Sequence, residues 1–227
     1  VDPYLDTHLT GVTVESILTV DDLSIPKTGG GTTRLAGIPD GIGAIDGADL
    51  SPAEPDYFYL LVNHELNTNA GVVRDHGETG AFVSKWKIRK DNREVVEGDD
   101  LVKEFFDWDT SSGSFVAAPG AALFNRMCSS DLPAPTALFN SATGKGSNEF
   151  LYFNGEETSG GRALGHVVTG PDAGKSYHLE HLGFAAFENV LLNPFEQDMT
   201  IAALTDDDEN GEVYFYLGTK QAEAGQT

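Results

Sequence analysis

The sequence predicts an all-β protein built from antiparallel, β-propeller-like blades. In the second half of the chain, short strand-like runs follow one another closely, and Gly, Pro, Asn or Asp separates most of them. These runs cover residues 149–153, 162–169, 175–179, 189–192, 200–204 and 212–217. Helical periodicity does not extend beyond about ten residues in any segment. Short strands at close, regular spacing favour an antiparallel all-β fold, and their blade-like grouping favours a propeller.

The length of the chain predicts an incomplete propeller. Blades of this kind take about 40 to 50 residues each, so the 227 residues of this sequence allow about four or five blades. We therefore expect an incomplete ring, or one part of a larger propeller, in a single domain at 1–227. Within it, residues 1–33 would form an N-terminal strand and a flexible loop. The last strands, at 200–204 and 212–217, would leave a sheet edge open, which predicts a second chain completing the propeller or a homo-oligomer.

In the first half of the chain, the clearest strand predictions are residues 57–62 and 80–89. The first run is aromatic and aliphatic on both faces, as in a central strand, and the second alternates as a strand with one solvated face. Alternation also predicts a strand at 12–20. Three consecutive glycines predict a flexible loop at 27–33, and Asp-Gly signals predict a turn at 37–43.

The middle of the chain has weaker signals. The charged segment 91–109 is expected to include a short helix at 101–106. Residues 110–148 are dominated by Gly, Ser, Pro and Ala, and no strand is predicted there.

The charge of the chain limits its partners. There are 36 acidic residues against 14 basic ones, which gives a formal net charge of −22. Binding to nucleic acid through phosphates needs a basic face, and the sequence offers none, so this class of function is excluded. Two explanations of the acidity remain, and they are compatible: solubility in salt-rich surroundings, or bound cations that neutralise part of the excess acid.

Several features predict an exported protein. The single cysteine, Cys128, cannot form an internal disulfide, and a low cysteine content is common in exported bacterial proteins. No apolar run approaches the roughly twenty residues needed to span a bilayer. The sequence starts at Val1 without an initiator Met or a hydrophobic signal segment. We expect a periplasmic or extracellular protein whose signal peptide has been removed, although a trimmed chain would look the same.

Acidic residues repeatedly end the predicted strands. A strand that finishes on a carboxylate delivers it to one edge of a sheet, so several such endings predict a common rim of oxygen ligands. Ca²⁺ takes about six to eight oxygens from carboxylates, amides and carbonyls. The candidate ligands are Asn63, Glu65, Asn154, Glu156, Glu157, Glu188, Asn189, Asp206 and Asp208. The alternatives are solvated strand ends, an exposed turn at Glu156 and Glu157, and a hairpin turn on Asn210 and Gly211.

The order of these motifs carries a family resemblance. Along the chain come the Pro39-Asp40-Gly41 turn, the Asn63-His64-Glu65 strand end, Cys128, the Glu156-Glu157 pair, the Phe187-Glu188 pair and the Thr205-Asp206-Asp207 strand end. The order of these motifs resembles that in the PhoX-type alkaline phosphatases and their propeller relatives. The chain departs from them by Phe187 in place of a His, by Asp206 in place of a Glu, and by an unrelated segment at 129–149.

The resemblance implies a site and an activity. It implies an exported β-propeller with a cluster of calcium and iron at the mouth of its channel, where phosphate monoesters are hydrolysed. Cys128 would be the thiolate ligand of iron, and Glu157, Glu188 and Asp206 would be carboxylate ligands. Glu65, at the end of an earlier strand, completes the predicted metal-ligand set.

Hydrolysis would also need groups that hold the phosphate and move protons. Arg162 could bind a phosphate through two hydrogen bonds, and His166 could transfer protons because its unperturbed pKa is near 6.5. Alternatively, Arg162 pairs with a neighbouring acid, His166 is an ordinary strand histidine, and Cys128 is a small buried hydrophobic residue.

Two functions from different classes therefore remain open. One is an exported, calcium-dependent phosphoesterase that hydrolyses small-molecule phosphate esters at a metal cluster. The other is a calcium-stabilised extracellular structural or binding propeller without catalysis.

Overall fold

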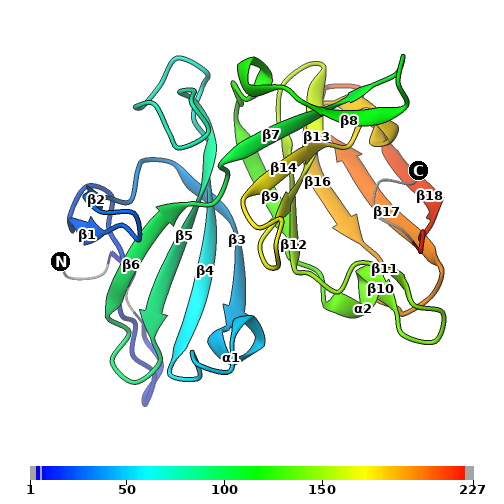
Figure 1. Ribbon diagram of the computed structural model, residues 1–227. Helices are drawn as coiled ribbons and strands as arrows, with labels where there is room; N and C mark the ends of the chain where they lie inside the picture. Colours follow the sequence, from blue (N-terminus) through cyan, green and yellow to red (C-terminus); the bar gives the residue numbers. More distant parts are fainter. Residues whose placement is uncertain (1–3, 6, 223–227) are drawn as a thin grey trace.

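The structure is a computed structural model that describes residues 4, 5 and 7–222. It is an all-β fold whose three larger sheets are open, since none of them closes on itself within the described residues. The sheets lie one beside another, with the N-terminal and C-terminal sheets on opposite sides of a central one (Figure 1). Within this part of the chain, no helix is long and apolar enough to cross a membrane.

The N-terminal sheet is a four-stranded antiparallel meander. Its strands are β3 (Pro39–Asp46), β4 (Tyr57–His64), β5 (Phe82–Arg89) and β6 (Val95–Asp100), paired in that order. The two strand predictions at 57–62 and 80–89 are confirmed as β4 and β5. The turn predicted at 37–43 is wrong, because β3 covers most of it. Its glycines serve close packing, since a Cβ on Gly41 would lie 2.6 Å from the backbone nitrogen of Ser130.

The central sheet has seven strands. Its order is β8 (Ser114–Ala117), β7 (Glu104–Asp109), β14 (Lys175–His178), β13 (Gly161–Val167), β12 (Leu151–Glu156) and β9 (Met127–Asp131), and β15 (Phe184–Ala185) also pairs with β13. All pairs are antiparallel except β7 with β14. The helix predicted at 101–106 is wrong: the segment joins β6 to β7, and Phe105 is buried in the core between the sheets.

The C-terminal sheet contains three antiparallel strands, β16 (Phe187–Leu192), β17 (Met199–Asp206) and β18 (Val213–Thr219), with β18 at the edge. Short elements complete the fold: β1 (Ile25–Pro26), β2 (Thr32–Thr33), β10 (Phe139–Asn140), β11 (Lys145–Gly146), α1 (Gly47–Leu50), α2 (Pro135–Leu138), η1 (Pro119–Ala121) and η2 (Glu180–Leu182). The six strand-like runs predicted in the second half correspond to β12, β13, β14, β16, β17 and β18.

The strand predicted at 12–20 is wrong. The segment has no regular structure, and Ile17 and Leu18 pack against the cluster of Trp86 and Ile88 on the N-terminal sheet. Their apolar character therefore reflects packing of an irregular segment rather than strand pairing.

Two apolar cores hold the layers together. Ile45, Leu61 and Val83 of the N-terminal sheet pack with Met127 and Tyr152 of the central one. On the other side, Phe153 and Ala163 of the central sheet pack with Phe187, Val190 and Leu204 of the C-terminal sheet. Strand β9 lies where the sheets meet, since it contacts β3, β4, β12 and β16.

Candidate metal centre

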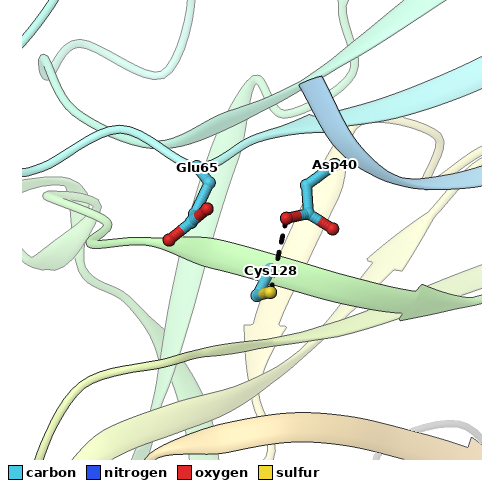
Figure 2. A group of neighbouring side chains, drawn as sticks. All are labelled: Asp40, Glu65 and Cys128. Atoms are coloured by element: carbon cyan, nitrogen blue, oxygen red, sulfur yellow. Dashed lines mark hydrogen bonds between the residues drawn. The ribbon is translucent and has the colours of Figure 1, made fainter. Parts of the chain in front are cut away.

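Acidic side chains from four different strand regions surround the thiol of Cys128. Asp40 and Glu65 form one group with Cys128, and Glu157 and Glu188 form a second, with the ligand atoms of each group within 4.8 Å of one another. Figure 2 shows the carboxyl groups of Asp40 and Glu65 beside Cys128. The side chains come from β3, the end of β4, β9, the end of β12 and β16. Cys128 belongs to both groups, so it is the centre of one five-residue cluster, which we call the Cys128 cluster.

Close backbone packing brings these strands together. The missing side chain of Gly41 allows β3 to approach β9 at Cys128 and Ser129. Gly155 does the same for β12 and β16, because a Cβ on Gly155 would overlap with the Cβ of Phe187. The pairing of β12 with β9 also shifts register between Asn154 and Glu156, as in a β-bulge. Bulges re-aim side chains near sites, and this one lies next to Glu157.

The thiol of Cys128 faces the carboxylates of Asp40 and Glu188. Its Sγ atom lies 3.4 Å from Oδ2 of Asp40 and 3.7 and 3.6 Å from Oε1 and Oε2 of Glu188. Cys128 is 8% exposed. Burial raises the pKa of the Cys128 thiol far above its usual value, and hydrogen bonds to Glu157 and Asp40 and the nearby negative charges raise it further. At these distances the thiol of Cys128 can donate a hydrogen bond to the carboxylates.

The carboxylates repel one another in this arrangement. Burial raises the pKa of Glu188, and the charges of Glu157, Asp207 and Asp40 raise it further, while the hydrogen bond from Cys128 acts in the opposite direction. Like charges held close together favour either a shared proton or a bound cation.

Arg126 neutralises part of this charge. Its Nε atom donates to Oε1 of Glu65 at 2.8 Å, and its Nη2 atom donates to Oε1 of Glu157 at 2.8 Å. The hydrogen bond to Glu65 and the two acidic charges raise the pKa of Arg126. Within the described part of the chain, Asp40 and Glu188 form no ion pair with a basic side chain. The side of the cluster formed by Asp40, Cys128 and Glu188 therefore has uncompensated negative charge.

The donor set is suited to two kinds of metal. The two carboxylates of each group offer two oxygens in monodentate and four in bidentate binding, so Ca²⁺, which takes roughly six to eight oxygens, would complete its shell with carbonyls or water. A thiolate is a softer ligand, preferred by iron and zinc over calcium. A metal ion bound at Cys128 would reverse the effect of the surrounding acids and favour the thiolate.

Four of the five predicted metal ligands lie together in the structure. Glu65, Cys128, Glu157 and Glu188 belong to the Cys128 cluster. Asp206 is outside it, and its Oδ1 atom accepts a hydrogen bond from the backbone of Ala186 at 3.0 Å. Asp40 is the residue that the ligand prediction missed. Its signal was the Pro39-Asp40-Gly41 motif, which local sequence patterns assigned to a turn.

The two predicted catalytic residues have partners of their own. Arg162 binds both carboxylate oxygens of Glu156, through Nε at 2.7 Å and Nη2 at 2.9 Å, and its Nη1 atom donates to the carbonyl of Ala121 at 2.7 Å. The pairing with a neighbouring acid, the alternative considered for Arg162, is present. His166 is fully buried, with Nδ1 2.7 Å from Oγ of Ser176 and Nε2 2.9 Å from Oδ1 of Asn154. Their catalytic roles remain predictions.

A buried polar network holds the backbone of β9 at Cys128 in place. Asn63 donates to the carbonyls of Cys128 at 2.6 Å and Ser129 at 3.1 Å. Its own carbonyl accepts from the hydroxyl of Tyr152 at 3.0 Å and from Asn154 at 2.9 Å, and Asn154 continues to His166. Asn63, one of the asparagines that the sequence presented as possible calcium ligands, therefore orients the backbone of β9, and Asn154, another of them, links Asn63 to His166.

Comparisons of this chain with protein-family models, with curated proteins and with solved structures found no significant match.

Proposed function

We propose that the Cys128 cluster is a metal centre that binds Ca²⁺ through its carboxylates and a second metal, iron, through the Cys128 thiolate. The observation that carries this proposal is that four carboxylates lie around the thiol of Cys128 on β9. Arg126 forms ion pairs with only two of them, Glu65 and Glu157. Like charges that are close together and partly buried raise the free energy of the folded chain unless a cation or protons compensate them. A cation between Asp40, Cys128 and Glu188 would remove the repulsion.

We further propose that the metal centre hydrolyses phosphate esters. A bound cation can polarise a phosphoryl oxygen and lower the pKa of an attacking water. Arg126 supports this activity, because its guanidinium lies at the cluster and its side chain is 41% exposed. A guanidinium in this position could contact two phosphate oxygens. Arg126 is thus a better candidate than Arg162 for binding the phosphate.

Metal analysis and a hydrolysis assay test the two proposals together. The purified protein, after extensive dialysis, should retain calcium and iron, and it should release p-nitrophenol from p-nitrophenyl phosphate. Absence of any retained or titratable metal would contradict the metal centre. Retained metal without hydrolysis would contradict the phosphoesterase and leave the centre in place.

A second function is a calcium-stabilised structural or binding protein. It is favoured by the internal hydrogen bonds of Arg162 and His166, because these bonds keep the two expected catalytic residues away from a substrate. Calcium retained alone, with higher thermal stability and no p-nitrophenol release, would support this function. Either function fits an exported protein, since weak calcium sites are filled at the millimolar concentrations found outside cells.

We propose that the chain is part of a β-propeller-like assembly. The N-terminal sheet supports this, because a four-stranded antiparallel meander is the unit from which propeller blades are built. Strand β18 is an open edge in which Val213, Phe215 and Leu217 are exposed and no residue is charged. Natural edge strands usually carry charges or prolines that prevent pairing. We infer that a second copy of the chain pairs with β18, and a strictly monomeric protein in solution would contradict this.

A further inference from the structure

A cavity of about 540 Å³ lies between the central and C-terminal sheets. Its apolar walls include Trp108, Phe115, Leu151, Leu182, Leu192 and Tyr216. None of the residues of the Cys128 cluster lines it, so it is distinct from the proposed metal centre. Its volume is within the range of about 300 to 1,000 Å³ that small-molecule sites occupy.

The cavity opens to solvent beside the core that joins the two sheets. Leu151, Leu182, Leu192 and Tyr216 pack against the buried cluster around Phe153, yet each is only partly buried. Their remaining apolar surface faces water in the free protein, so covering it with an apolar group supplied by a ligand would be favourable.

One buried lysine is among the residues that line the cavity. Lys220 lines it and is 6% exposed, and its ammonium donates to the carbonyls of Gln197 at 2.8 Å and Met199 at 3.0 Å. An ammonium has three donors, so these two bonds leave one donor for another acceptor. Gly146 packs against the aliphatic stem, where an added Cβ would lie 3.0 Å from Cδ of Lys220. The ammonium is thus fixed in place by the backbone around it.

The charge of Lys220 is not neutralised by a salt bridge. Within the described residues, no acidic side chain forms an ion pair with Lys220, and the carboxylate of the nearby Asp198 binds Asn140, Thr143 and Lys145 instead. Burial lowers the pKa of Lys220, which shows that lost hydration outweighs the attraction of Asp198. A carboxylate bound beside Nζ would restore the lost interactions through a charge-assisted hydrogen bond.

We propose that this cavity binds a small amphipathic carboxylate, with its apolar body between the two sheets and its carboxylate paired with Lys220. Glu180, at the start of η2, is the acidic residue among the lining side chains. Its charge disfavours a carboxylate near η2 and so helps to direct that group to Lys220. The proposal is independent of any metal at Cys128.

Intrinsic fluorescence can measure the binding directly. The chain has two tryptophans: Trp108 lines the cavity, and Trp86 is buried in the N-terminal sheet. Decanoate, below its micelle concentration, should change the emission in a saturable way, and Trp108→Phe should abolish the change. The methyl ester of decanoate has the same tail without the charge, and it should bind the wild-type protein roughly tenfold more weakly.

Substitutions at Lys220 test the role of the ammonium. Lys220→Met should lose the preference for decanoate over its methyl ester, whereas Lys220→Arg should keep it. Lys90→Met is the matched control, because Lys90 pairs with Asp46 on the N-terminal sheet, away from the cavity. This variant should keep the wild-type preference for decanoate over its methyl ester. Equal binding of decanoate and its ester by the wild-type protein, or no saturable change with decanoate, would overturn the proposal even if Lys220→Met does not fold.

Discussion

Cys128 shows how its neighbours decide the chemical state of a side chain. In sequence it is a lone cysteine, the kind of residue that is commonly a small apolar core residue. In the structure its thiol lies within hydrogen-bonding distance of Asp40 and Glu188, and burial, followed by the acids around it, raises its pKa. A metal ion would exchange the thiol proton for a metal–sulfur bond, so metal binding at the cluster should release protons.

Glu188 gives the most direct test of the metal centre. Glu188→Gln removes one charge that lies beside Cys128 and forms no ion pair with a basic side chain of the described residues. We expect Ca²⁺ affinity, measured by calorimetric titration, to fall by roughly 10- to 100-fold, on the scale seen when metal-site partners are lost. Glu94→Gln is the matched control, since Glu94 is an exposed acid in the connection between β5 and β6. Equal calcium affinities of the two variants would contradict the site.

His166 should make the fold sensitive to acid. Burial and, to a smaller extent, the charge of His76 together lower the pKa of His166 from 6.5 to about 3, so the unfolded chain binds this proton more readily than the folded one. The stability that neutral His166 contributes is present above pH 6.5 and is lost as pH falls toward about 3. Each pH unit within this window costs up to about 1.4 kcal/mol per such histidine.

The variant His166→Gln isolates this contribution. The free energy of unfolding, measured in urea, should fall less between pH 6.5 and pH 5 in the variant than in the wild type, by about 2 kcal/mol. His181→Gln, at an exposed position, is the control. Burial also lowers the pKa of His76 to about 4, so part of the acid sensitivity should remain. An unchanged pH dependence in His166→Gln would show that His166 does not carry it.

At the scale of elements, β9 organises the site although it has only five residues. It pairs with β12, contacts β3 and β16, and carries Cys128 where those strands approach most closely. Two glycines make this approach possible, Gly41 against β9 and Gly155 against β16. The geometry of the cluster therefore depends on positions that carry no chemistry themselves.

Gly155→Ala should disturb both the fold and the metal centre. The new Cβ would overlap with Phe187, so β12 and β16 would have to separate, and Glu157 and Glu188 would move apart. We expect a loss of about 1 to 3 kcal/mol of stability, as for other overpacked cores, together with weaker Ca²⁺ binding. Gly120→Ala is the control, because a Cβ there meets no atom within 4 Å. A variant as stable as the control, with unchanged calcium affinity, would contradict this account.

The open edge at β18 leads to a prediction about assembly. Leu217 is 65% exposed on a strand without charges. Leu217→Lys places a charge on this edge, the device that natural edge strands use against pairing. By size-exclusion chromatography with light scattering, the wild-type chain should be a dimer and the variant a monomer. Leu5→Lys, at another exposed leucine, should stay dimeric.

At the scale of the whole molecule, the net charge of −22 has a local component in the Cys128 cluster. If Ca²⁺ binds there, it should stabilise the folded chain by an amount that grows with the logarithm of the calcium concentration above the dissociation constant. At 100 times the dissociation constant the gain is about 2.7 kcal/mol, or roughly 5 to 10 °C in melting temperature for a chain of this size. Differential scanning fluorimetry with calcium and with a chelator measures this.

An ionic-strength control separates site binding from general screening. Sodium chloride at matched ionic strength also screens surface charge, but it should give only a small part of the rise in melting temperature that calcium produces. A shift reproduced fully by sodium chloride would show that the acidity acts through the surface as a whole.

The predictability of each strand followed from its side-chain pattern. Strands β4 and β5 have strong apolar or alternating sequences, and both were predictable. Strand β3 contains Gly41 and Gly43, which resemble turn residues but serve close packing, and β9 lies in a segment rich in small residues. Residues 12–20 show the converse error, since Ile17 and Leu18 pack on the N-terminal sheet without pairing. Alternation reports which side chains are buried, and it does not report which backbones pair.

By itself, the sequence determined the all-β class, eight of the eighteen strands in the described residues and the acidic strand ends, because these depend on local propensity and periodicity. Only the tertiary structure decided that Glu65, Cys128, Glu157 and Glu188 meet, that Asp40 joins them, and that Asp206 caps a backbone elsewhere. It also turned Arg162 and His166 inward. The physical reason is that a cluster depends on which strands approach one another, and contacts between distant segments set that approach.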